Sequence, residues 1–469
     1  MARNSMVSLS HTQWHHGSFK RLFLVIAGLG LAVLLSTPQA HATASFSRQT
    51  GLACNVCHTT FPELTPFGRD FKLHAYAMSS ENDITDKGNK KNADLDLLKV
   101  LPLSINLRGG LTQTGNRQPD TRNSNIELPQ QVNLWFAGKL AEHIGSYTQM
   151  TYNVQGNHFA FDNSDFFRYA RDAKLGGKSF TWGIDANNDP TFEDLWNSTP
   201  AYGFPWVAPD AVVSPSASTL IDGGLGGDVL GLGVYGMLSD HLYGLVSLYR
   251  TQHIGGPQPA NGLGYTHNIS GAAPYWRFAY QASKGSNYLE VGTFGFHEDS
   301  YPGTITTTPA ISGPTDSYTD SGADLTYERS LHAGDLFVVH SLFIYEKQDL
   351  VATFQERGAA QADHNLKTFR LDAAYHFGNK YTITAGPFLT TGTVDSVLYP
   401  TAPVTGSANH KPKNDGYIAQ FAWWPSQNIE TGVQYRGYET FNGGGKNYDG
   451  FGRNASGNNT TFAYIWLSF

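Results

Sequence analysis

The sequence is poor in cysteine, in charged residues and in long hydrophobic runs. Charged residues make up 15% of its 469 residues, and a formal net charge of −7 provides no basic surface for nucleic acid. After the amino terminus, no stretch approaches the roughly 18 consecutive apolar residues that a membrane-spanning helix needs. Any residence in a membrane must therefore come through β-structure, which the abundant Gly, Tyr, Phe and Thr would suit. A soluble periplasmic protein is the alternative.

The one long apolar run lies at residues 22–35, directly after two basic residues. Small residues follow at 40–44, so the segment has the charged start, apolar centre and cleavage site of a secretory signal peptide. The run is too short and wrongly flanked for a membrane-spanning helix, although an uncleaved anchor is the alternative. We expect cleavage after Ala42 or Ala44 and assign residues 1–42 to the signal peptide.

The two cysteines are three positions apart and directly precede a histidine, in the sequence Cys54-Asn55-Val56-Cys57-His58. Covalent c-type haem attachment requires this spacing. Each cysteine can form a thioether with one haem vinyl group, and His58 can bind the iron as proximal ligand. The alternatives are a chance match or a redox disulfide, but a thioredoxin-like site needs a βαβ context that does not follow. We predict one covalent haem c.

A short helix is predicted after this motif, because Leu64, Phe67 and Phe71 recur at i, i+3 and i+7. With few residues before the barrel begins, no independent hydrophobic core of useful size can form here. These side chains either cover the porphyrin face or pack against the barrel wall, and the pattern leaves both open. We assign residues 43–95 to a monohaem cytochrome c segment.

The second axial ligand matters for the reduction potential, because His/Met ligation raises it relative to two nitrogen ligands. Met78 and His74 are the nearby distal candidates, with Met78 favoured. An open or water-ligated site is the third option. The remaining histidines, such as His253, His267 and His297, have no metal-ligand spacing and fit solvated barrel or loop positions.

Residues 96–469 repeat one theme, in which two strands of roughly ten alternating residues flank a tight turn and a long polar loop follows. The clearest hairpin is 368–389, which turns at Gly378-Asn379. The other short turns fall near 142, 239–240, 284–285, 331–332 and 426–427, and the long loops at 257–270, 301–317, 352–364, 399–414 and 442–459. This strict alternation of short turns and long loops is typical of outer-membrane barrels.

The predicted fold class is all-β: a transmembrane antiparallel β-barrel of about 16 strands, with a short N-terminal α-helical cytochrome segment that plugs the lumen. A soluble β-sandwich would also show alternation, but it has no reason to segregate loop length by face. Aromatic residues ending at Phe469 resemble the carboxy-terminal signal that barrel-assembly machinery reads. We therefore expect the protein in the bacterial outer membrane, surrounded by its lipid.

One predicted loop, residues 187–224, is unusually apolar for a solvated segment and contains Leu195, Trp196, Phe204 and Trp206. We expect it to fold inward, where it would constrict the lumen or cover the haem. An ordinary ordered external loop is the alternative.

A dense set of residues around the haem motif carries a resemblance to a known family. The set consists of Phe46, Arg48, Gln49, Thr50, Gly51, Cys54, Cys57, His58, Phe61, Pro62, Leu64, Phe67, Gly68, Arg69, Phe71, Lys72, Leu73 and Tyr76. Together with a weaker match at residues 196–205, it covers about a tenth of the chain. These residues resemble the fused cytochrome-porins of the bacterial outer membrane, best known as iron oxidases of Fe(II)-oxidising bacteria. Ser47 and Ala75 depart from the Ala and Gly of that family, and neither touches haem attachment.

The resemblance implies electron transfer from outside the cell, through the haem, to a periplasmic c-type cytochrome. Fe(II) is the favoured extracellular donor and an Fe(II) oxidase the favoured activity, although no dedicated iron site is identifiable in the sequence. Within this function, an electrode, a mineral or a partner cell is the alternative donor. The alternative function is a diffusion porin or transporter whose haem segment is a plug, gate or redox sensor.

Overall fold

The computed structural model describes residues 45–78, 83–86, 95–118, 123–154, 157–222, 225, 229–251, 268–302 and 312–469. All of them belong to one unit, Ala42–Phe469. The predicted signal peptide and most of the predicted loop 257–270 lie outside these ranges. None of the helices within them is long and apolar enough to cross a membrane.

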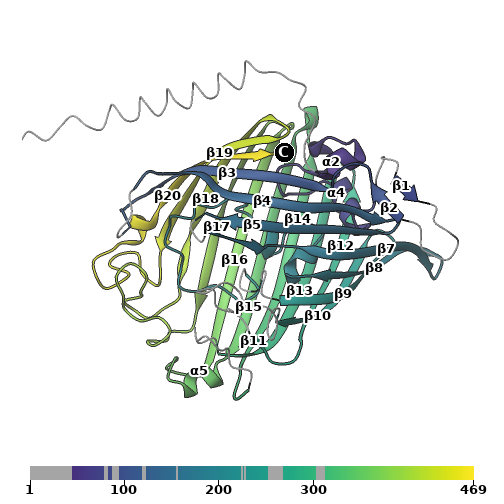
Figure 1. Ribbon diagram of the computed structural model, residues 1–469. Helices are drawn as coiled ribbons and strands as arrows, with labels where there is room; N and C mark the ends of the chain where they lie inside the picture. The colour runs from purple at the N-terminus through teal and green to yellow at the C-terminus, as the bar shows by residue number, and fades with distance from the viewer. Residues whose placement is uncertain are drawn as a thin grey trace, which may run out of the picture. The chain divides into compact units, whose positions relative to one another are not determined.

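The described strands from β3 onward close into a single antiparallel barrel, in which β20 pairs with β3 (Figure 1). Sixteen of these strands are long, and β6 (His158–Phe161) and β11 (Asn268–Ile269) are short strands paired with β5 and β13. The long strands are β3 (Leu103–Thr114), β4 (Asn125–Ala141), β5 (Ile144–Asn153), β7 (Asp165–Leu175), β8 (Lys178–Asn187), β9 (Val229–Leu238), β10 (Leu242–Thr251), β12 (Ala273–Lys284), β13 (Asn287–Tyr301), β14 (Asp316–Ser330), β15 (Leu336–Asp349), β16 (Asp363–Phe377), β17 (Tyr381–Gly392), β18 (Asn414–Ser426), β19 (Ile429–Thr440) and β20 (Thr460–Ser468). The predicted barrel of about sixteen strands is confirmed. A separate two-stranded sheet pairs β1 (Asp83–Asp86) with β2 (Leu95–Leu98).

The barrel wall carries apolar side chains outward and most of its polar side chains inward. Successive side chains of a strand point to opposite faces, and on β9 Leu232 and Val234 keep 66% and 57% of their surface exposed while their neighbours are buried. On β16, Asp372 and His376 are buried in the interior. A soluble protein would show the reverse distribution, whereas a barrel in lipid needs this one.

The predicted hairpin 368–389 is confirmed in register as well as in type. Phe369 pairs with Leu389 and Phe377 with Tyr381, so β16 and β17 join at the predicted Gly378-Asn379 turn. The apolar positions of both strands therefore share one face, and that face points outward.

Short turns and long connections occupy opposite ends of the barrel. Short turns join β9 to β10, β12 to β13 and β18 to β19 at the predicted positions. Two of the long connections contain the short helices α5 (Val351–Gln355) and η4 (Ala455–Asn458). A further short turn, Gly176–Gly177, joins β7 to β8 and is not among the predicted ones.

The N-terminal segment, residues 45–78, carries the helices α2 (Ser45–Thr50), α3 (Cys54–Cys57) and α4 (Pro66–Leu73). Helix α4 begins with a proline in its first turn, and Oγ1 of Thr65 caps it by accepting a hydrogen bond from N of Gly68 at 3.1 Å. The predicted short helix is confirmed, although it begins after Leu64.

Contacts to distant strands place the N-terminal segment inside the barrel, near the short turns. Nε2 of Gln49 donates to O of Ala137 on β4 at 2.9 Å. Arg69 forms an ion pair with Glu328 on β14, and the hydroxyl of Tyr76 donates to a carboxylate of β7. Because these strands lie apart around the ring, the segment occupies the lumen as predicted.

The connection between β8 and β9 also folds into the lumen. This inward segment, residues 188–222, contains η1 (Pro190–Glu193) and η2 (Pro200–Tyr202), and its first twelve residues are all buried. Oγ of Ser198 donates to Asp324 on β14 at 2.6 Å, and Nε2 of Gln434 on β19 donates to O of Val207 at 2.9 Å. The segment therefore crosses the lumen from wall to wall.

Candidate functional site

Cys54, Cys57 and His58 line one cavity of about 440 Å³. The two cysteines lie at the ends of α3, a single helical turn, and both are free thiols. The cavity is bounded by the N-terminal segment, the inward segment and the wall strands β3, β4, β5 and β20. The structure thus brings the three predicted attachment residues to one enclosed space, where haem attachment stays a prediction.

Helix α4 packs directly on the turn that contains Cys57. At Gly68, a Cβ would approach O of Cys57 to 2.2 Å, so no larger residue fits there without a shift of the backbone. N of Thr65 donates to the same carbonyl at 2.9 Å, and Oγ1 of Thr65 donates to O of Val56 at 2.5 Å. These contacts hold the motif in one orientation toward the cavity.

The ring of His58 is held by the backbone, with Nδ1 3.3 Å from O of Glu63. A ring N–H donated there leaves Nε2 with the lone pair, which is how imidazole ligands are commonly oriented. Burial lowers the pKa of His58 to about 4, so the ring is neutral, as an iron ligand must be. Burial also raises the pKa of the Cys57 thiol to about 11, whereas redox dithiols use a lowered pKa.

Ten aromatic side chains line the cavity. They are Phe46, Phe61, Phe71 and Tyr76 of the N-terminal segment, Phe192, Tyr202 and Trp206 of the inward segment, and Trp135, Tyr147 and Trp466 of the wall. Leu64 also faces the cavity, whereas Phe67 is not among the lining residues. Leu64 and Phe71 thus border the cavity, and whether they would cover a porphyrin face stays a prediction. Such an apolar, aromatic wall suits a flat porphyrin.

One guanidinium extends into this aromatic wall. Cζ of Arg108 lies 4.1 Å from the ring centroid of Trp466, and Nη1 donates to Oε1 of Gln131 at 2.9 Å. Nε of Arg108 is buried and has no hydrogen-bond partner among the described residues. A buried donor normally has a partner, and a haem carries two carboxylates. Arg108 could therefore pair with a haem propionate.

The two distal candidates do not line the cavity. Nδ1 of His74 lies 2.9 Å from O of Asp70, and Nε2 lies 3.3 Å from Oδ1 of Asp172. The ring of His74 donates a hydrogen bond to the carboxylate of Asp70, which raises the pKa of His74 to about 9. Met78 is 40% exposed. Apart from His58, no described histidine or methionine borders the cavity, and the distal ligand stays a prediction.

The N-terminal segment and the inward segment hold each other. Nζ of Lys72 donates to O of Phe192 at 2.5 Å and to O of Asp194 at 2.8 Å. Nδ2 of Asn197 donates to O of Pro62 at 2.9 Å. The expectation that the long loop folds inward is confirmed, because it meets the N-terminal segment inside the barrel. That it covers a haem stays a prediction.

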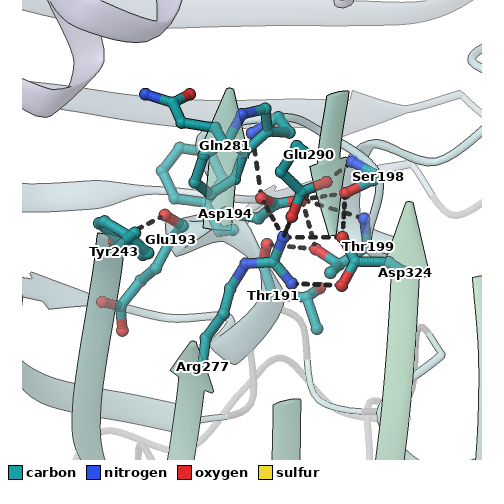
Figure 2. Close-up of polar contacts among 12 residues, drawn as sticks. Thr191, Glu193, Asp194, Ser198, Thr199, Tyr243, Arg277, Gln281, Glu290 and Asp324 are labelled. Atoms are coloured by element: carbon teal, nitrogen blue, oxygen red, sulfur yellow. Dashed lines mark hydrogen bonds and ion pairs between the residues drawn. The ribbon is translucent and has the colours of Figure 1, made fainter. Parts of the chain in front are cut away.

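An ionic cluster fixes the inward segment to the barrel wall, as Figure 2 shows. The buried Arg277 of β12 lies 3.0 Å from Asp194 of the inward segment, 3.2 Å from Glu290 of β13 and 2.7 Å from Asp324 of β14. Asp194 in turn accepts hydrogen bonds from N and Oγ of Ser198 at 2.8 and 3.1 Å. We call this set the Arg277 cluster. It explains how the inward segment is held inside the lumen.

A carboxylate of the N-terminal segment reaches two wall histidines that the sequence interpretation missed. Oε2 of Glu63 lies 3.2 Å from Nε2 of His376, and Oε1 lies 3.8 Å from Nε2 of His340. Burial alone would raise the pKa of Glu63, but the charges of His376 and His340 lower it to about 2. The available signal was strand alternation, which turns both histidines inward. Within the described ranges, no group of three His, Cys, Asp or Glu side chains could hold a metal ion.

The chain was compared with known proteins. No family model and no curated protein matches it. Among solved structures, OmpF of Salmonella typhi in complex with daunomycin is 11% identical, with a TM-score of 0.46, over 78% of this chain and 97% of that one. The outer-membrane channel DcaP of Acinetobacter baumannii is 10% identical, with a TM-score of 0.42, over 78% of this chain and 96% of that one. No statement on function follows from likenesses of this degree.

Proposed function

We propose that this protein is an outer-membrane electron conduit. It accepts electrons from an extracellular donor, favoured to be Fe(II), at one c-type haem held by Cys54, Cys57 and His58, and passes them to a periplasmic cytochrome. The observation that carries this proposal is that these three side chains line one aromatic cavity inside a closed barrel. When bound, the haem supplies a one-electron redox centre.

The distribution of side chains on the wall supports residence in the outer membrane. Exposed apolar residues such as Leu232, Phe278 and Ile383 cover the outside of the barrel, and a closed barrel leaves no unpaired strand edge in lipid. In such barrels the short turns face the periplasm and the long loops face outward. The haem cavity would then lie toward the periplasm, because it borders Ser104 near the start of β3 and Ser468 at the end of β20.

Residues of this chain could anchor the haem segment, exclude water and bind the haem. Glu63 and Lys72 anchor the N-terminal segment to the wall and to the inward segment, and the aromatic lining keeps water from the haem. Arg108 supplies a counter-charge for a propionate. His58 offers a neutral, oriented imidazole.

The cavity lies far from the long loops, and this distance limits how an extracellular donor can reach it. Beyond Arg108, the rest of β3 spans about 20 Å toward the long loops. Electron transfer weakens steeply with distance, so the donor has to approach through the lumen. Asp320 and Glu346 lie directly opposite each other on β14 and β15, nearer the long loops, and accept hydrogen bonds from N of Ile221 and N of Leu220 of the inward segment. The inward segment therefore also borders the path that a donor would take.

The test begins with the purified, detergent-solubilised protein in its ferric state. Fe(II) is added without oxygen, and the haem bands are followed. We expect the bands to sharpen and shift to those of ferrous haem c. A colourless protein would remove the whole proposal, whereas reduction by dithionite but not by Fe(II) at the organism's working pH would remove only the iron assignment.

A diffusion porin with the haem segment as its gate is the second candidate, because a barrel of sixteen strands is wide enough for a water channel. Conductance in planar bilayers separates the two functions. The contacts of Lys72 and Asn197 across the lumen lead us to expect little current from the intact protein. A large open-channel current in the intact protein would favour the porin, and a current that appears only after deletion of residues 46–78 would favour the conduit.

A further inference from the structure

The hairpin of β7 and β8 extends beyond the barrel wall at the short-turn end. Closer to the centre of these strands, Arg168, Ala170 and Thr181 are buried in the usual alternation. Every residue of 171–179 is exposed, on both faces of the hairpin, and Figure 1 shows the two strands reaching past their neighbours. The tip turns at Gly176–Gly177, whose φ angles of 59° and 81° suit a tight hairpin turn. The tip therefore has neither lipid nor lumen beside it.

The exposed tip is basic. Arg171, Lys174 and Lys178 stand on it, and none of the three forms an ion pair with another described residue. Its one acidic residue, Asp172, already accepts a hydrogen bond from Oγ1 of Thr181 at 2.7 Å and lies 3.3 Å from Nε2 of His74. The cationic side chains are thus available to an outside partner.

The contact with His74 links the tip to the helix that packs on the haem motif. His74 directly follows α4, and α4 packs on Cys57 through Gly68. Val56, between the two cysteines, keeps 36% of its surface exposed. Cys54 contacts Gln427 in the short turn between β18 and β19, so the haem motif and the tip lie at the same end of the barrel.

We propose that this basic tip, Arg171, Lys174 and Lys178, is a docking arm for the acidic face of the soluble electron-transfer protein that takes electrons from the haem. The inference rests on the proposed function and specifies the partner by charge. Complementary charge steers encounter and orients a partner without the need for a large interface. An acidic protein held at the arm would be kept at the end of the barrel where the haem motif is exposed.

The experiment uses the full-length haem protein and two probes that differ only in charge. Ferric mitochondrial cytochrome c, which is basic, and the same protein with its lysines succinylated, which is acidic, are each mixed with the ferrous protein in a stopped-flow instrument. One electron passes from the ferrous haem of this chain to the ferric probe, with no proton or bond change. We expect the acidic probe to react faster at low ionic strength and to lose that advantage as salt is added.

The arm variant Arg171→Gln, Lys174→Gln, Lys178→Gln is expected to slow the reaction with the acidic probe by about tenfold at low salt. The matched control Lys284→Gln, Arg329→Gln, Lys380→Gln removes the same charge from exposed residues elsewhere around the short-turn end. It is expected to change the rate by less than about twofold.

Equal slowing by both variants, or an unchanged rate in the arm variant, would overturn the docking arm and leave the conduit standing. If the unmutated protein showed no haem spectrum, or if dithionite did not reduce it, that result would instead count against the proposed function. Because all six substituted side chains are exposed, the spectra of both variants are expected to match that of the parent.

Discussion

The cavity around Cys57 and the Arg277 cluster lie in the same lumen but differ in charge compensation and in open space. At Arg277, three carboxylates surround one guanidinium at 2.7 to 3.2 Å. Around Cys57, two thiols are free, Nε of Arg108 lacks a partner among the described residues, and about 440 Å³ is open. Protein interiors are normally close-packed and their polar groups paired. The charges of the Arg277 cluster are therefore compensated within the protein, although Nε of Arg277 also lacks a hydrogen-bond partner among the described residues. The cavity, by contrast, leaves open space that a ligand could fill.

The largest effect is expected when the two cysteines that would attach the haem are replaced. The double variant Cys54→Ser, Cys57→Ser is expected to lose all covalently bound haem while the barrel remains folded, because neither thiol pairs with the wall. Haem staining after denaturing electrophoresis measures the loss, and circular dichroism checks the barrel. Cys54→Ser alone serves as control and should retain haem through one thioether. A double variant that stays red after denaturation would show that the haem is held elsewhere.

The Arg277 cluster should respond in the opposite way, with a loss of stability and no change in haem content. Arg277→Met leaves three buried carboxylates without their cation, and breaking a buried ion pair in this way costs about 3–5 kcal/mol. Denaturant unfolding of the detergent-solubilised protein measures the cost. Arg436→Met is the control, since Arg436 forms no ion pair with a described residue and lies over the ring of Phe388. Similar stability of the two variants would argue against the cluster as an anchor.

The two regions also differ in how far they could be predicted from the sequence. The haem motif is local, so five consecutive residues were enough to predict it, and alternation alone predicted the hairpin 368–389 with its register. The Arg277 cluster joins residues of β12, β13, β14 and the inward segment. Alternation turns Arg277 inward, but no pattern in the sequence states which carboxylates it meets.

The distal ligand stays a prediction. His74 and Met78 follow the haem motif closely, yet neither borders the cavity. Ala75 and Tyr76 have φ angles of 59° and 55°, in the left-handed region, and reverse the chain directly after α4. Position 75 is also where this chain departs from the glycine of the family it resembles. A left-handed pair of non-glycine residues is not evident from helical periodicity.

The contact of Glu63 with the wall histidines makes the anchoring of the N-terminal segment sensitive to acid. The pKa of Glu63 is lowered from 4.5 to about 2, so its contribution to stability is present above pH 4.5 and is lost as the pH falls toward 2. This loss amounts to about 3 kcal/mol at most. Denaturant unfolding between pH 5 and pH 2.5 measures it. Glu63→Gln is expected to be less stable at pH 5 and to depend less on pH, and equal slopes for variant and parent would exclude this role.

The smallest expected effect tests whether Arg108 of the cavity wall interacts with the haem. A positive charge near a haem favours the ferrous state, so Arg108→Gln should lower the reduction potential by roughly 50 mV, as expected for a partly screened charge about 10 Å from the iron. Arg108→Lys keeps the charge and should stay close to the parent, while Arg436→Gln removes an interior cation that does not line the cavity. Spectroelectrochemical titration of the three variants measures the shifts. Equal potentials for Arg108→Gln and Arg436→Gln would mean that Arg108 does not act on the haem, and its unpaired Nε would then need another ligand.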